Sequence, residues 1–221
     1  MIVLLFGPPG CGKGTQAAAI AARFQIPAIS TGELFRAHCK AGTDAGNKEY
    51  AILSQGGLVG DDIVNRMVAS RIAQGDCAEG FLLDGYPRTA PQARFFSSLV
   101  KERDLCDPVI VHLDVPTQPL IARLTARRQC PQCLHIYNLH SQPPRAEGKC
   151  DQDGAGLISR ADDQEAVIRQ RLEAYDELTD PILQWYGAEA IVRIDGNRAP
   201  ELVARDIEQA LRNRRLVPIV R

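Results

Sequence analysis

A glycine-rich loop near the start of the chain has the residue types and spacing to hold phosphate groups. The segment Gly7-Pro-Pro-Gly-Cys-Gly12-Lys13 matches the pattern G-x-x-x-x-G-K, and it lies between the apolar run Ile2–Phe6 and a helix-favouring stretch. In such a loop the glycines let backbone N–H groups turn inward around phosphate oxygens, and the helix start adds partial positive charge. The lysine reaches the outer phosphates. The sequence therefore predicts a nucleotide-phosphate site here.

The residue after this lysine departs from the usual form of the loop. Gly14 stands where most such loops carry the serine or threonine that binds magnesium, and Thr15 comes one position later. We therefore expect magnesium to be held through water and through a carboxylate elsewhere in the chain. We expect Cys11 to be a small loop residue rather than a nucleophile.

Three cysteines and an aspartate form a second group whose spacing suggests chemistry. Cys130 and Cys133 are two residues apart, Cys150 follows later, and Asp153 stands where a fourth cysteine would complete two pairs. Clustered cysteines in a reducing compartment indicate a metal before a disulfide. Zinc in structural sites takes four ligands, and it accepts carboxylate oxygen as well as thiolate.

Alternatives to this ligand set remain open from the residues alone. His135 or His140 could replace Asp153 as the fourth ligand, and iron or cobalt could replace zinc. The cysteines could also hold no metal and be hydrogen-bonded or oxidised.

The elements that must position these groups alternate along the chain. Apolar runs predict strands at residues 2–6, 28–30, 81–84, 109–115 and 190–195. Amphipathic stretches predict helices at about residues 31–41, 44–55, 61–74, 89–101, 117–128, 163–187 and 200–214. This alternation indicates an α/β fold with a doubly wound parallel sheet.

Two local features bear on the long helix near the C-terminus. Pro181 is expected to kink or break it, because proline lacks the backbone N–H that a helix interior uses. Asp162 and Asp163, followed by Glu165, have the residue types of a helix N-terminal cap.

Composition excludes several classes of protein. The 221 residues carry a formal net charge of -1, so no overall field attracts nucleic acid or an anionic membrane. No stretch approaches the roughly 20 apolar residues that cross a bilayer, and the N-terminal "MIVLLF" is too short for a signal-peptide core. We therefore expect a cytoplasmic protein without nucleic-acid or membrane partners. A zinc-ribbon nucleic-acid module fused to a nucleotide-binding fold is the rival hypothesis from a different class.

Four motifs, in order, resemble the adenylate kinases, and specifically the bacterial type with a long lid. They are GPPGCGKGTQ at residues 7–16, ISTGELFR at 29–36, FLLDGYPRTAPQ at 81–92 and SRADDQEAVIRQRL at 159–172. The resemblance spans nearly the whole chain. It implies a phosphate-loop (P-loop) core made of residues 1–29, 60–128 and 161–221, an inserted AMP-binding subdomain at 30–59, and an inserted lid at 129–160 that carries the zinc-ribbon-like site.

The resemblance also implies an activity and assigns site residues by matching position. The activity is reversible phosphoryl transfer from MgATP to AMP, giving two ADP, by a monomer. The residues expected at ATP are Gly10, Cys11, Gly12, Lys13, Gly14, Thr15, Arg123, Arg127, Ile136, Tyr137 and Arg198. Those expected at AMP are Thr31, Arg36, Gly57, Leu58, Val59, Gly85, Arg88, Gln92, Arg160 and Arg171.

The remaining assignments concern catalysis and metals. The residues expected to take part in the transfer are Lys13, Asp84, Arg88, Arg127, Arg160 and Arg171, with Asp84 orienting magnesium through water. Metal-binding lids of this family use either cysteine or aspartate as the fourth ligand. The resemblance therefore implies structural zinc held by Cys130, Cys133, Cys150 and Asp153.

These residue types suit the implied chemistry. Phosphoryl transfer requires in-line positioning and charge stabilisation, and arginine forks onto phosphate oxygens through its planar donors. The lid is expected to close before the reaction, since ATP could otherwise phosphorylate water. Thr31 and Gln92 favour adenine, because an amide can pair with the adenine edge as donor and acceptor. GTP as phosphoryl donor remains open.

Overall fold

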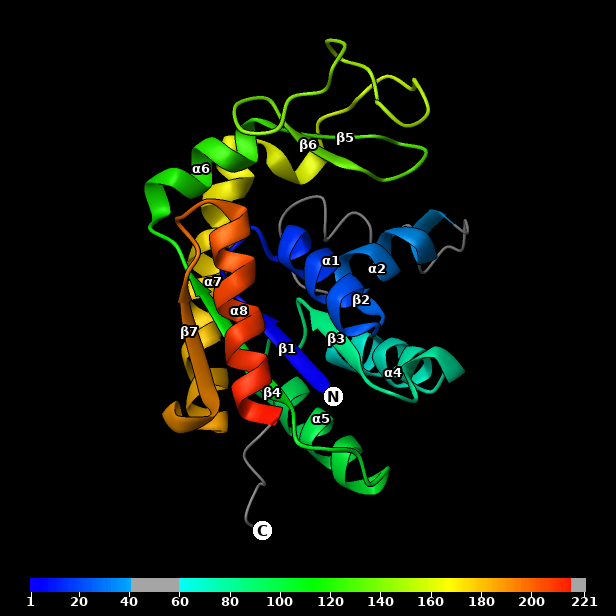
Figure 1. The fold of residues 1–221 in the computed structure, drawn as a ribbon, viewed down its shortest axis with the longest axis vertical. Helices are drawn as coiled ribbons and strands as arrows, with labels where there is room; N and C mark the ends of the chain where they lie inside the picture. The colour runs from blue at the N-terminus through cyan, green and yellow to red at the C-terminus, as the bar shows by residue number, and fades with distance from the viewer. Residues whose placement is uncertain (41–59, 216–221) are drawn as a thin grey trace.

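The computed structural model describes residues 1–40 and 60–215, and its centre is a five-stranded parallel sheet (Figure 1). The strand order is β2-β3-β1-β4-β7, with bounds Ala28–Ser30, Phe81–Asp84, Ile2–Phe6, Val109–Asp114 and Ile191–Asp195. The doubly wound parallel sheet is therefore confirmed. In such sheets ligands bind beyond the carboxyl ends of the strands, where the strand order reverses. The glycine loop follows the central strand β1 at this position.

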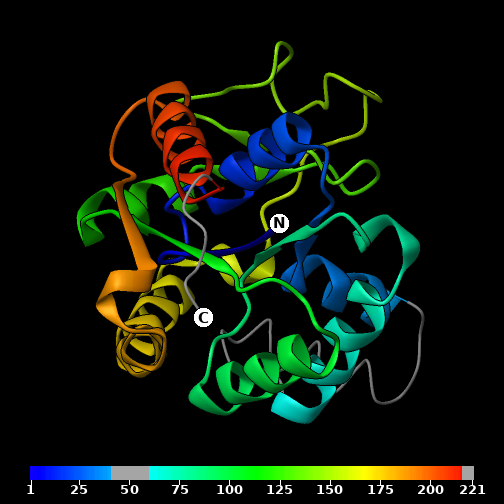
Figure 2. The same ribbon diagram turned by 60° about the horizontal axis from the view of Figure 1, so that its bottom comes forward.

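Helices cover both faces of the sheet (Figure 2). Their bounds are Lys13–Phe24 (α1), Thr31–Lys40 (α2), Asp61–Ile72 (α4), Ala90–Glu102 (α5), Thr117–Thr125 (α6), Glu165–Tyr186 (α7) and Pro200–Arg215 (α8). Short 3-10 turns lie at Gly75–Cys77 (η1), Ala161–Asp163 (η2) and Ala188–Ala190 (η3).

The alternating side chains of β1 explain the two apolar layers. Leu4 and Phe6 pack with residues of α4, α5 and the C-terminal part of α7, whereas Val3 and Leu5 pack with residues of α1, α6 and α8. All five residues of β1 are buried. Burial on both faces is what makes a parallel strand a continuous apolar run. The core therefore fixes the strand ends from which the glycine loop and Asp84 project.

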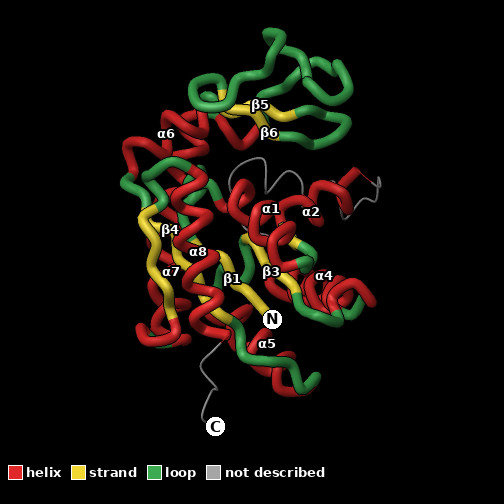
Figure 3. The backbone as a smooth tube through the Cα atoms, in the orientation of Figure 1, coloured by secondary structure: helices red, strands yellow, loops and turns green. Residues whose placement is uncertain are grey.

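The lid is a separate unit at the top of the view, made mostly of loops (Figures 1 and 3). It is built on the antiparallel pair β5 (Arg127–Gln129) and β6 (Ile136–Asn138). Its buried cluster consists of Cys130, Tyr137 and Cys150, with Ala155 and Leu157 packed against it. So small an apolar cluster gives little stability by itself, so polar contacts must hold the lid.

Several expected element bounds are wrong. The helix expected over residues 117–128 ends at Thr125, and its last residues form strand β5 instead. Pro181 lies inside α7 without breaking it, because Ile182 and Leu183 on the same turn are buried in the core. The expected capping role of Asp162 and Asp163 is also wrong, since the side chains do not cap α7.

Part of the expected AMP-binding insertion lies outside the described residues. This part includes the helix expected over residues 44–55 and the residues Gly57, Leu58 and Val59. Among the described residues, no helix has the length and apolar character that a membrane span needs.

Candidate active site and lid metal cluster

The side chain of Lys13 folds back onto the glycine loop that follows β1. Lys13 is the first residue of α1, and its Nζ donates to the carbonyl oxygens of Gly7 at 2.5 Å and Pro8 at 3.0 Å. Gly10 has φ +83°, and a Cβ there would lie 2.8 Å from Cγ of Leu124 in α6. Only glycine allows this close approach and this backbone conformation. The loop therefore presents backbone N–H groups and one movable ammonium to a ligand.

The other loop residues differ in exposure. Cys11 is buried, and burial raises the pKa of its thiol although Lys13 opposes this effect. Its side chain packs in the apolar layer with α1 and α6, which suits a small loop residue. Gly14 and Thr15 are exposed at the start of α1.

Arginine side chains from separate segments gather in one place. Burial and the charges of Arg127 and Arg36 together lower the pKa of Arg160 to about 9. Burial and the charges of Arg127 and Arg88 lower the pKa of Arg171. Like charges this close repel each other, and a multiply charged phosphate chain would neutralise them. The structure thus brings together five of the arginines that the sequence assigned to the site.

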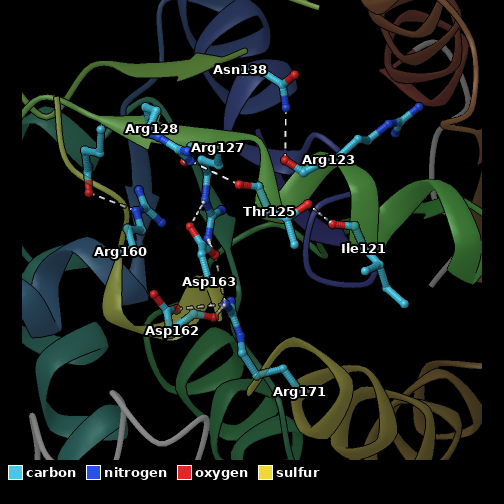
Figure 4. Close-up of polar contacts among 11 residues, drawn as sticks. Ile121, Arg123, Thr125, Arg127, Arg128, Asn138, Arg160, Asp162, Asp163 and Arg171 are labelled. Carbon is cyan, nitrogen blue, oxygen red and sulfur yellow. Dashed lines mark hydrogen bonds and ion pairs between the residues drawn. The ribbon is translucent and has the colours of Figure 1, made fainter. Parts of the chain in front are cut away.

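Two adjacent aspartates neutralise part of this positive charge (Figure 4). Asp163 accepts hydrogen bonds from Nε and Nη2 of Arg127 at 2.8 and 2.5 Å. Nη1 of Arg171 lies 2.8 Å from Oδ2 of Asp162 and donates to its backbone oxygen at 3.0 Å. Although burial opposes it, the charge of Arg171 holds the pKa of Asp162 below its usual value. Sequence reasoning missed this pairing because the two aspartates precede a helix and match a cap.

The residues expected around AMP meet at the end of β3. Thr31 Oγ1 donates to the carbonyl oxygen of Gly85 at 2.8 Å, and Arg88 Nε donates to the same oxygen at 2.9 Å. Gly85 has φ +79°, and a Cβ there would lie 2.7 Å from Nη2 of Arg88. Asp84 lies close enough for its charge to act on Arg36, on Arg88 and on Cys11. Asp84 therefore stands between the arginine cluster and the glycine loop.

The amide of Gln92 already has partners at both ends. Its Oε1 accepts from the backbone N–H of Arg88 at 2.7 Å, and its Nε2 donates to Oδ1 of Asp61 at 2.8 Å. Asp61 also accepts from Thr89 Oγ1 at 3.0 Å. A base that pairs with this amide can use its second N–H and the second lone pair of its oxygen. Asp61 gave no signal in the sequence, because it reads as an ordinary acidic residue in a first helical turn.

Two expected ATP residues lie together at the loop after β7. Arg123 Nη2 donates to Oδ1 of Asn197 at 3.0 Å, and the adjacent Arg198 forms an ion pair with Asp206. Figure 4 shows the Arg123 side chain pointing away from Asp163, which binds Arg127.

Ile136 and Tyr137, expected together at ATP, have different surroundings. Ile136 is exposed, whereas the Tyr137 side chain is buried in the lid cluster. The Tyr137 hydroxyl lies 3.4 Å from Sγ of Cys150 and accepts from the backbone N–H of Asp151 at 2.7 Å. The hydroxyl therefore has two partners within the lid, and the expected contacts of Ile136 and Tyr137 with ATP stay predictions.

The four expected metal ligands meet in the lid. The ligand atoms of Cys130, Cys133, Cys150 and Asp153 all lie within 4.8 Å of one another. Sγ of Cys133 is 3.5 Å from Sγ of Cys150, and tetrahedral zinc with sulfur at 2.3 Å separates two sulfurs by about 3.8 Å. Backbone N–H groups two residues after Cys130 and Cys150 point at their sulfur atoms, each at 3.4 Å. The group is compatible with a structural metal.

The fourth position of this group belongs to an aspartate. Oδ2 of Asp153 lies 3.1 Å from Sγ of Cys130. The N–H of Ala155 donates to Asp153 and, with the thiols, lowers the pKa of its carboxyl to about 2. A carboxylate that is anionic at neutral pH is the form that binds a metal. His135 is directed elsewhere, since its Nδ1 lies 3.2 Å from Nε2 of Gln152.

Comparison with known proteins places the chain in a family. Residues 5–191 match the family model described as adenylate kinase. The adenylate kinase of Syntrophomonas wolfei is 44% identical over 212 residues, which cover 96% of this chain and 99% of that relative. The adenylate kinase of Symbiobacterium thermophilum is 43% identical over 213 residues, with the same shares covered. The adenylate kinase of Trichlorobacter lovleyi is 46% identical over 192 residues, covering 87% of this chain and 90% of the relative.

These matches cover the segments that build the site just described. They run through the glycine loop, the turn after β3, the lid and the first part of α7. With a phosphate loop, an arginine cluster and full-length relatives that share one description, the chain belongs to the adenylate kinase family.

Proposed function

We propose that this chain catalyses the reversible transfer of the terminal phosphoryl group of MgATP to AMP, giving two ADP. The observation that carries the proposal is the gathering of five arginines, of which Arg36 and Arg88 also interact with Asp84 beside the glycine loop. Transfer between two nucleotides needs such a place, because charge from both phosphate chains meets there.

The residues divide the work between two nucleotides. In the proposal, Lys13 leaves the carbonyls of its own loop and binds the outer phosphates of ATP together with the backbone N–H groups. Arg127 contacts the ATP side, while Arg36 and Arg88 hold the AMP phosphate. Arg160 and Arg171 contact the AMP phosphate as well as the transferred group, whose charge they stabilise. No side chain acts as a nucleophile, since the attacking atom is an AMP phosphate oxygen.

Asp84 fits the carboxylate that orients magnesium. Its position at the carboxyl end of β3, between the glycine loop and the arginines, matches the expectation drawn from Gly14. When bound with ATP, Mg²⁺ neutralises charge on the phosphates and helps to fix their geometry. Asp84 would orient it through water.

Zinc is the proposed metal of the lid. Three thiol groups and one carboxylate within 4.8 Å of one another suit Zn²⁺, with all four positions filled by protein. The site would therefore be structural, because it offers no open position to a substrate. Asp153, rather than His135 or His140, is the proposed fourth ligand.

The proposed acceptor is AMP, and the proposed donor is ATP. Support for adenine comes from the buried amide of Gln92, which offers a donor and an acceptor, and from Thr31 beside it at Gly85. We further propose that the chain acts as a monomer in the cytoplasm. The bacterial sources of the relatives support the location.

The test is a direct measurement of ADP formed from MgATP with AMP, CMP, UMP or GMP as acceptor. We expect turnover with AMP well above the other three, and MgGTP in place of MgATP tests the donor. A Lys13→Ala protein purified in parallel controls for contaminating kinases. No turnover with any acceptor, together with tight RNA binding, would instead support the zinc-ribbon hypothesis.

A further inference from the structure

The aspartate pair at the base of the lid contains two carboxylates with different surroundings. The Asp163 side chain is 0% exposed, whereas that of Asp162 is 21% exposed. Asp163 is bonded to two nitrogens of one guanidinium, whereas Asp162 meets Nη1 alone of another. Neighbours in the sequence thus differ in how easily a ligand can replace them.

The ion pair between Asp163 and Arg127 joins the two points where the chain enters and leaves the lid. Arg127 lies where the chain enters the lid at β5, and Asp163 lies where it returns to the core in η2 (Figure 4). The carboxylate occupies the Nε–Nη2 edge of the guanidinium, so the direction of Nη1 is fixed. Two parallel charge-assisted hydrogen bonds set geometry as well as energy. A buried carboxylate with this pairing is costly to separate from its arginine.

Asp162 holds Arg171 in a way that a phosphate can replace. Both contacts of Asp162 use Nη1 of Arg171, at 2.8 Å to the carboxylate and at 3.0 Å to the backbone oxygen. Oδ1 of Asp163 is farther from the same nitrogen, at 3.7 Å. The Asp162 carboxylate therefore supplies the negative charge at Arg171 that a nucleotide phosphate would supply.

We propose that Asp163 is a positioning residue for Arg127 in phosphoryl transfer, whereas Asp162 competes with the nucleotide phosphate for Arg171. The inference rests on the proposed kinase function and deepens it. Asp163 acts throughout the cycle and never touches substrate. Asp162 occupies Arg171 in the nucleotide-free enzyme and gives it up when a phosphate binds.

The inference predicts a loss of function when Asp163 is replaced and a gain in AMP affinity when Asp162 is replaced. The isosteric variants Asp163→Asn and Asp162→Asn test this difference. Asp163→Asn should lower kcat by roughly 10²-fold, because a misplaced catalytic group costs about that much, while KM for AMP changes less. Asp162→Asn should tighten AMP binding several-fold in calorimetry without ATP, because Arg171 loses its competitor. Equal losses of affinity in both variants would overturn the competitor role.

A double-mutant cycle separates positioning from a merely structural brace. If Asp163 acts through Arg127, Asp163→Asn should lower kcat much less in an Arg127→Ala background than in the wild type. Additive losses, or a wild-type kcat in the Asp163→Asn variant, would overturn the positioning role. Thermal melting reports folding, so a variant that melts early is replaced by Asp163→Glu, which keeps the charge but shifts its position and should also lower kcat.

These results are distinguishable from failure of the proposed function. A wild-type protein without AMP-dependent ADP formation would remove the kinase proposal itself. Normal wild-type turnover with a null result in the cycle would remove only the role of the aspartate pair.

Discussion

The base and the tip of the lid are both held by polar groups, but these groups differ in what they face. At the tip, Cys130 and Cys150 are buried, Cys133 and Asp153 are exposed, and the four ligand atoms lie within 4.8 Å of one another. At the base, Arg171 and Asp162 remain 18% and 21% exposed and their pairing uses one nitrogen. The tip stabilises a shape, and the base keeps charges in a position where substrate can bind them.

The comparison teaches why one small unit uses two kinds of contact. The lid has too little apolar surface for a core of its own, so polar bonds must replace apolar burial. A metal bound by four protein ligands is held strongly, and it leaves no coordination position for a substrate. Ion pairs that phosphates can replace are weaker, and they suit the end of the lid that receives the nucleotide.

The largest expected effect comes from removing a base arginine. Arg127→Ala should reduce kcat by roughly 10²–10³-fold, because one well-placed stabilising donor contributes about that much. Its melting temperature should also fall, because the Asp163 side chain is 0% exposed and would lose both hydrogen bonds to Arg127, keeping Arg171 at 3.7 Å. Steady-state kinetics and thermal unfolding measure both. The surface variant Arg169→Ala, on an exposed pair of α7, is the matched control.

Removing the metal from the tip should give the complementary pattern. Cys130→Ala should lose the bound zinc, which elemental analysis measures, and it should speed amide hydrogen exchange in residues 129–158. The reason is that structural zinc in small peptides contributes about 10–16 kcal/mol of apparent binding free energy coupled to folding. Turnover should fall far less than in Arg127→Ala. Unchanged exchange after chelation would contradict a metal-stabilised tip.

Replacing Arg160 should raise the stability of the protein and lower its activity. Burial and neighbouring arginines lower its pKa to about 9, so folding disfavours the charged form. That cost is fully present below about pH 9, and it disappears as the pH rises from the folded-state pKa towards the unfolded one. Arg160→Gln should therefore melt a few degrees higher than the wild type at pH 7 while losing activity.

The same argument predicts how that stability gain depends on pH. The difference in melting temperature between Arg160→Gln and the wild type should shrink above pH 9. Arg169→Gln, which removes an exposed arginine, should show no such gain. A lower melting temperature for Arg160→Gln at pH 7 would show that its hydrogen bond to Gln129 outweighs the repulsion.

The smallest expected effect concerns the Tyr137 hydroxyl. It accepts from the N–H of Asp151, so its own proton is available to the Cys150 sulfur. Tyr137→Phe should weaken zinc binding by about 10-fold, at the lower end of the range for groups that orient metal ligands. Competition with a chelator measures the change. His140→Ala should leave zinc affinity unchanged, and a loss there would make His140 the fourth ligand.

Much of the fold was predictable, because its signals are local. The apolar runs Ile2–Phe6 and Phe81–Asp84 are strands with the expected bounds, since a parallel strand buried on both faces needs such a run. The helix ending at Thr125 was overextended, because its residues up to 128 keep a helical pattern while the lid pairs them into β5. Pro181 was expected to kink or break the helix, and it does not break it, since Ile182 and Leu183 on the same turn are buried in the core.

Within the site, the sequence determined which groups exist, and the tertiary structure decided which of them meet. The pattern from Gly7 to Lys13 and the spacing of the cysteines each lie within one loop or lid, so local chain geometry suffices to predict them. The partners of Arg127, Arg171 and Gln92 come from other segments, and their residue types also suit caps and helix surfaces. Only folding brings those segments together, because the pairing of distant charges depends on the packing between them. For that reason Asp163 is a cap by its sequence and an arginine partner by its structure.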